Sequence, residues 1–177
     1  MLVSPFANER VRQWPWQHYR ALIEMIVREH GHPVVVVGTR AQRTSANAIV
    51  RGLSSEMVAN ACGAWNWQEL VQAVDAAPYV VANNSGVAHL AASRGRWTLC
   101  VFSASHAYCE WMPRGPRVVT LVRALPCSPC SLGSERCSNG VACMVDFRPA
   151  EVFWCFNYAR DTAAARALSE ASKTMAA

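Results

Sequence analysis

A continuous run of four valines, at positions 34–37, constrains the fold of this chain more than any other segment. Four β-branched residues in a row fit a strand that is buried on both faces, as strands are in a parallel sheet. Other apolar stretches recur along the chain, and segments with helical spacing lie between them. This alternation predicts a Rossmann-like α/β fold, a parallel sheet with helices on both faces.

Turn and capping residues indicate where these elements begin and end. Pro15 suits the first turn of a helix, and Gly31 suits its left-handed end. Asn66 followed by Glu69 has the spacing of a capping box. The expected strands are at 2–4, 34–37, 57–61, 79–82, 97–102 and 117–122. The expected helices are at 15–30, 41–53, 67–76, 87–94 and from 149 onward, with a long loop at 103–116.

Length and composition bound the class of protein. The 177 residues support one domain, placed at 1–158, followed by an alanine-rich tail at 159–177. With 52% hydrophobic and 16% charged residues, a disordered chain is excluded. No apolar run has the length of a transmembrane segment, and no signal-peptide pattern is visible, so a cytoplasmic protein is expected.

The positive charge does not indicate nucleic-acid binding. The net charge is +5, and sixteen of the seventeen basic residues are arginines. They are scattered along the chain and form no basic run, so we expect no nucleic-acid partner.

The polar turn at 83–86 is the best candidate for chemistry. It joins an expected strand to an expected helix, and ligands of open α/β sheets bind at such carboxyl ends. Free N–H groups at a helix start bind anions, and Gly86 would let a phosphate approach the backbone. Ser85 supplies a hydroxyl, and His89 lies one turn further along. An ordinary capped turn with a packed histidine would have the same spacing.

The residues of this turn resemble a known motif. The segment at 83–92, N-N-S-G-V-A-H-L-A-A, is similar to N-D-S-G-x-x-H-L-A-A of the ADP-heptose lipopolysaccharide heptosyltransferases, glycosyltransferase family nine. Three further segments agree in order: R-Q-W-P at 12–15 with K-x-W-P, 63–70 with G-x-x-S-L-x-E-L, and 127–152 with C-x-P-C…C-M…P-E-x-V. The resemblance covers about residues 2–153.

The resemblance implies a fold, a ligand and a missing partner. The family has the GT-B fold, two Rossmann-like domains, and this chain resembles the C-terminal half that binds the donor. The implied ligand is a nucleotide-diphosphate sugar such as ADP-heptose, for transfer to a lipopolysaccharide-core or other glycan. An N-terminal acceptor domain or partner subunit would supply the catalytic base. The protein would lie in the cytoplasm, with the inner face of the membrane as a further location. The implied donor-binding residues are Arg12, Gln42, Trp65, Asn84, Ser85, Gly86, Val87 and His89.

Three of these positions depart from the family pattern. Arg12 occurs where the family has lysine, Gln42 where it has glutamate and Asn84 where it has aspartate. The two amides carry no negative charge. An altered sugar donor and an inactive stand-alone nucleotide-sugar-binding or scaffold module are both consistent with these changes. The loop at 103–108 stands where the family has a loop over the diphosphate. Ser103 and Ser105 could donate to phosphate there, or the loop is plain surface.

Four cysteines fall within the segment 125–144. Four thiolates suit a structural zinc or iron site, although only the first C-x-x-C spacing is typical of one. The alternative is that the thiols are reduced and pack within a loop. The sugar transfer that the resemblance implies requires no cofactor. The four are Cys127, Cys130, Cys137 and Cys143. Separately, Trp154, Cys155, Phe156 and Tyr158 suggest an apolar face toward a missing domain or a twin subunit, and a twin subunit would make a homodimer.

Overall fold

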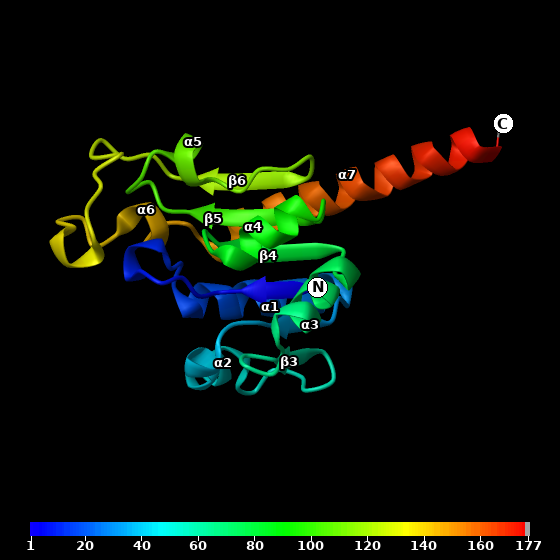
Figure 1. Cartoon of the computed structure of the whole chain (residues 1–177), viewed down its shortest axis with the longest axis horizontal. Helices are drawn as coiled ribbons and strands as arrows, with labels where there is room; N and C mark the ends of the chain where they lie inside the picture. The colour runs from blue at the N-terminus through cyan, green and yellow to red at the C-terminus, as the bar shows by residue number, and fades with distance from the viewer. Residues whose placement is uncertain (176–177) are drawn as a thin grey trace.

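The computed structural model describes the backbone of residues 1–175, with the side chains of all of these except 108, 109 and 166–175. Six parallel strands form one sheet in the order β3-β2-β1-β4-β5-β6 (Figure 1). The chain order reverses between β1 and β4, which is where open α/β sheets bind ligands. The predicted Rossmann-like fold is confirmed. The strands are β1 (Leu2–Ser4), β2 (Val34–Val36), β3 (Val58–Asn60), β4 (Tyr79–Asn83), β5 (Trp97–Phe102) and β6 (Val118–Val122).

Helices cover both faces of the sheet. One face packs against α1 (Trp16–His30), α2 (Arg43–Val50) and α7 (Pro149–Met175). The other face packs against α3 (Trp67–Ala76) and α4 (Gly86–Ser93). Shorter elements lie in the connections: 3₁₀ turns η1 (Arg10–Arg12), η2 (Arg40–Gln42) and η3 (Ser134–Arg136), and helices α5 (Tyr108–Trp111) and α6 (Ala142–Val145).

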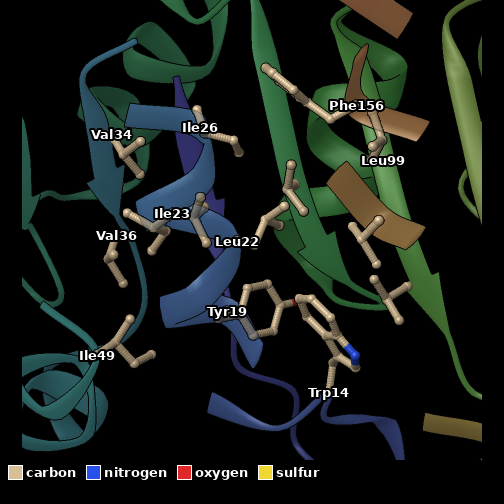
Figure 2. Packing of buried hydrophobic residues seen from close by; sticks show 14 of the residues in the cluster. Trp14, Tyr19, Leu22, Ile23, Ile26, Val34, Val36, Ile49, Leu99 and Phe156 are labelled. Carbon is tan, nitrogen blue, oxygen red and sulfur yellow. The ribbon is translucent and has the colours of Figure 1, made fainter. Parts of the chain in front are cut away.

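The larger of the two cores lies between the sheet and the helices α1, α2 and α7. Strand side chains alternate between faces, so Val81 and Leu99 enter this core while Val80 and Cys100 enter the other. Figure 2 shows side chains of α1 meeting those of the strands. Trp14 and Tyr19 pack edge to face, with ring centroids 4.8 Å apart, at the end of this core nearest the loop after β1.

Most expected elements occur close to their predicted bounds. Gly31 ends α1 in the left-handed conformation, with a φ of 61°, and Asn66 caps α3 through a capping box. The helix expected at 41–53 is shorter, because a 3₁₀ turn precedes it and Arg51 is extended. The short α5 lies inside the loop expected at 103–116. Strand β4 extends to Asn83, which was predicted to lie in the turn.

The last helix continues through the segment predicted to be a tail. α7 is one helix as far as Met175 (Figure 1). Within residues 1–175, no helix is both long enough and apolar enough to cross a membrane. Trp154 and Tyr158 are exposed and stack on each other with centroids 6.3 Å apart, whereas Phe156 is buried. The predicted apolar face therefore lacks Phe156, and the homodimer stays a prediction.

Candidate functional site

A cavity of about 700 Å³ opens at the carboxyl ends of the strands. Its walls come from the loops that follow β1, β2, β3 and β4, together with the starts of α3 and α4 and one residue of α5. The eight residues implied as donor-binding all line it: Arg12, Gln42, Trp65, Asn84, Ser85, Gly86, Val87 and His89. The parallel topology has brought together segments that are up to 77 residues apart in sequence, from Arg12 to His89.

The first turn of α4 presents hydrogen-bond donors that have no partner in the described part of the chain. Ser85 is the N-cap residue, but its side chain makes no capping bond, and its buried Oγ has no hydrogen-bond partner. The backbone N–H groups of the first turn also lack partners within the helix. A Cβ at Gly86 would meet nothing within 4 Å, so the backbone is open to a ligand. Together these donors suit a phosphate at the positive end of the helix dipole.

Asn84 and His89 form a pair on the wall of the cavity. The imidazole Nε2 of His89 lies 3.1 Å from the Oδ1 of Asn84, which can only accept, so Nε2–H donates. Burial lowers the pKa of His89, which favours the neutral ring. The pair therefore presents the Asn84 amide donors and a neutral imidazole.

Asn83, one residue earlier, is a structural centre that sequence analysis missed. It is completely buried, and its Oδ1 accepts from the backbone N–H of Trp14 (3.0 Å) and from the Tyr19 hydroxyl (2.9 Å). Its Nδ2 donates to the carbonyl oxygen of Pro5 (2.7 Å). These bonds fix both ends of the loop that carries Arg12, whose guanidinium also pairs with Glu9 at 3.1 Å. A polar residue that ends a buried strand was the available signal.

The loops after β2 and β3 form the opposite wall. Gln42 Oε1 accepts from the Thr39 N–H (2.8 Å), so its Nε2 group is left to donate. Gly63 lies so close to Arg40 that a Cβ there would be 2.5 Å from the Arg40 Cα. The Gly63 N–H also donates to the Gly38 carbonyl (2.9 Å). These contacts lock the two loops together.

The cavity combines aromatic rings with positive charge. Trp65, Trp67 and Trp111 line it, and Trp67 and Trp111 remain 65% and 59% exposed at its rim. Arg12 and Arg40 are its cationic residues, and none of its described lining residues is Asp or Glu. Such a site favours an anionic ligand with a flat aromatic part. Asn8, Thr39, Arg40 and Trp111 also line the cavity, although they belong to none of the four motif segments.

Comparison with known proteins agrees with this geometry. The profile of glycosyltransferase family 9 (heptosyltransferase) matches residues 1–140, most of the chain. This chain belongs to glycosyltransferase family 9. Lipopolysaccharide heptosyltransferase 2 of Salmonella typhimurium is 30% identical over 97 residues, covering 53% of this chain and 28% of the relative. Lipooligosaccharide heptosyltransferase 2 of Haemophilus influenzae is 29% identical over 117 residues, covering 64% and 33%.

Solved structures of heptosyltransferases share the fold. E. coli ADP-heptose lipopolysaccharide heptosyltransferase II superposes with a TM-score of 0.75 at 20% identity, covering 89% of this chain and 45% of that one. The iron-containing dodecameric glycosyltransferase TibC of enterotoxigenic E. coli gives 0.66 at 16% identity, covering 91% and 45%. The family 9 chain described here therefore spans a third or less of these curated relatives and under half of these structures.

The loop after β5 differs from its expected role in this family 9 chain. Ser103 and Ser105 are buried and line no part of the cavity. The Ser103 hydroxyl donates to Ser105 Oγ (3.0 Å), and Ser105 Oγ contacts His106 Nδ1 (2.9 Å). The prediction that these hydroxyls face a phosphate is wrong in this conformation, because they hydrogen-bond within their own loop.

The four cysteines do not come together as a metal site. Among the residues with described side chains, no three Cys, His, Asp or Glu residues are placed to hold a metal. Cys127 Sγ accepts from Asn139 (3.5 Å), Cys137 Sγ accepts from the Val141 N–H (3.2 Å), and Cys143 is buried beside Ser103. The residues as arranged do not fit a four-thiolate zinc or iron site, whose ligands must converge on one point.

Proposed function

We propose that this chain binds the nucleotide-diphosphate sugar of a heptosyltransferase-like glycosyltransferase, with ADP-heptose as the class of donor. The observation that carries the proposal is the convergence of all eight family-implied residues on one cavity at the free N-terminus of α4. Membership of family 9 supports the same ligand class. Because the chain spans less than half of its relatives, the transfer reaction is proposed for a whole enzyme to which this chain contributes the donor site.

The ligand would lie across the cavity with its diphosphate at α4. Arg12, the Ser85 hydroxyl and the N–H groups of the first α4 turn would bind the phosphate oxygens. The base would stack on Trp65, and the ribose would lie near Gln42 on the opposite wall. The sugar would then face the rim where the acceptor half is expected.

The proposed chemistry is displacement at the anomeric carbon. An acceptor hydroxyl, losing its proton to a carboxylate outside this chain, forms the new C–O bond while the bond to the diphosphate oxygen breaks. Negative charge develops on the leaving diphosphate. Arg12 and the α4 N–H groups stabilise that charge as fixed, preorganised donors. The charge stabilisation proposed here uses only groups of the protein.

A binding module without transfer activity is the second candidate. The observation that favours it is the chemistry of the cavity lining, where amides stand at 42 and 84 and no described residue is acidic. Such a module would bind the nucleotide sugar without transferring the sugar, even with an acceptor present. A transfer assay with a lipopolysaccharide-core acceptor distinguishes the two candidates when the acceptor half is supplied together with this chain.

Calorimetric titration with ADP, UDP, GDP and ADP-heptose tests the ligand class. We expect selective binding of ADP and ADP-heptose, and about tenfold weaker binding in Arg12→Gln, the loss of one charge-assisted contact. Arg28→Gln is the matched control, because it removes the same charge from an exposed position in the last turn of α1. Absence of binding to all four ligands would refute the proposal. Equal losses in the two variants would show that Arg12 has no specific role.

A further inference from the structure

Arg40 is an unused positive charge on the nucleoside side of the cavity. It lines the cavity, and no carboxylate with a described position lies within ion-pair distance of it. Arg12, the other cation of the lining, is by contrast paired with Glu9. An exposed guanidinium that faces a ligand cavity without an acidic partner is suited to bind an anionic group of that ligand.

The position of Arg40 is fixed by the fold. Its backbone follows β2 through Gly38 and Thr39, and Gly63 of the β3 loop packs directly against its Cα. Trp65 lies two residues beyond Gly63 and lines the same cavity. The backbone of Arg40 is therefore held beside the loop proposed to stack the base.

The hydrogen-bond donors next to Arg40 favour an anionic group over the neutral hydroxyls of a ribose. In dinucleotide-binding Rossmann domains, whose pyrophosphate lies at the turn after the first strand, an acidic residue binds a ribose hydroxyl, whereas an arginine nearby accommodates a ribose phosphate; the parallel with this chain is only an analogy, because the diphosphate is placed here at α4. Here the acid is absent: Gln42 is neutral, and its oxygen is occupied by the Thr39 N–H. The Gln42 Nε2 donors and the Arg40 guanidinium are thus two groups of this wall that can donate to a ligand.

We infer that the cavity takes a nucleotide whose ribose carries an additional phosphate, bound by Arg40 and Gln42. The inference rests on the proposed function, because it uses the placement of the base at Trp65 and of the 5′-diphosphate at α4. It refines the proposed donor class: a nucleotide-diphosphate sugar related to ADP-heptose, but with a phosphate on the ribose. The two amide substitutions then serve a more negatively charged ligand.

Two matched pairs of ligands test the inference by calorimetry at constant ionic strength. ADP-ribose and its 2′-phosphate differ only in a 2′ group, and 3′-dephospho-coenzyme A and coenzyme A differ only in a 3′ group. We expect the phosphorylated member of one pair to bind about tenfold more tightly, as one charge-assisted contact predicts. The pair that shows the preference identifies the phosphorylated position.

Two variants separate a contact from general attraction. Arg40→Gln should abolish the preference, so that the two members of the pair bind with equal affinity. Arg43→Gln removes the same charge three residues away, from an exposed side chain that donates to the Cys62 carbonyl and does not line the cavity, and should keep the preference. Circular dichroism of both variants confirms that they are folded.

The outcomes distinguish this inference from the proposed function. Equal affinities within both pairs, alongside measurable binding of ADP-ribose, would overturn the inference and leave the proposed function standing. Loss of the preference in Arg43→Gln as well would overturn it, because the attraction would then be long-range. If none of these nucleotides nor ADP bound, the proposed function would fail and the inference with it.

Discussion

Replacing Asn83 with alanine should destabilise the chain more than any change in the cavity lining. The substitution removes the partners of three groups: the Trp14 N–H, the Tyr19 hydroxyl and the Pro5 carbonyl. Each buried polar group left without a partner costs roughly 1–3 kcal/mol, so three cost on the order of 4 kcal/mol after partial relaxation. That is a large part of the roughly 5–15 kcal/mol that stabilises a domain.

Urea unfolding followed by far-ultraviolet circular dichroism measures this loss. Asn84→Ala is the matched control, because the adjacent side chain lies in the cavity and makes one bond, to His89; it should cost under about 1 kcal/mol. Tyr19→Phe removes one of the three bonds and should cost about 1 kcal/mol. Burial raises the pKa of Tyr19, so its hydroxyl stays a donor throughout the usual pH range. If Asn83→Ala unfolds at the same urea concentration as Asn84→Ala, the reasoning is refuted.

Three further changes test other parts of the fold by the same unfolding assay. Gly63→Ala should cost roughly 3 kcal/mol, from left-handed strain and a clash with Arg40, whereas Gly31→Ala has only the strain and should cost about 1 kcal/mol; equal losses would contradict the clash. Asn66→Ala should cost about 1 kcal/mol by removing the α3 capping box, and an unchanged urea midpoint would argue against that cap. Burial, followed by nearby positive charges, lowers the pKa of His32, so protons favour the unfolded chain and stability should fall as pH drops through about 6.5. His32→Gln should flatten this pH dependence, and a slope identical to wild type would exclude His32 as its source.

Much of the fold could be predicted because local residue types and tertiary packing agree. The strand at 97–102 and the helix at 67–76 have the predicted bounds, since the first is a buried apolar run and the second carries its own capping box. The segment at 41–53 was less predictable. Its first residues form a 3₁₀ turn whose geometry depends on the Gln42 side chain and on contact with the loop after β3.

The site was predictable where a motif and the sheet topology coincide. The family resemblance implied eight donor-binding residues from separate segments, and they line one cavity because parallel strands present their carboxyl ends at the same edge. The sequence marks Asn83 only as a motif residue at the end of a buried strand, because the partners that define its structural role lie 64 to 78 residues away in sequence. Arg40 belongs to no motif, and its importance depends on the absence of an acidic neighbour in three dimensions.

The cysteine segment shows that sequence spacing alone does not identify the ligands of a metal site. Four thiols within 17 residues have the number and type of a metal site, yet hydrogen bonds from Asn139 and Val141 engage two of them separately. Spacing gives the chain distance between ligands, whereas coordination requires that the sulfur atoms converge. The loop that carries them is joined to the loop after β5 through the Ser131 N–H and the Ser105 carbonyl.

The two adjacent asparagines at the end of β4 have different roles: Asn83 is structural, and Asn84 belongs to the proposed binding site. Asn83 faces inward and is saturated by three bonds, whereas Asn84 faces the cavity and shares one bond with His89. A carboxylate at 84, as in the family motif, would raise the pKa of His89 and reduce the positive charge of the cavity. If Asn84→Asp strengthens ADP binding, the natural residue weakens a site built for the family's usual donor. If it weakens binding of a ribose-phosphorylated nucleotide, the amides and Arg40 belong to one adaptation toward a more anionic ligand, because the amides remove negative charge from the cavity lining and Arg40 supplies positive charge.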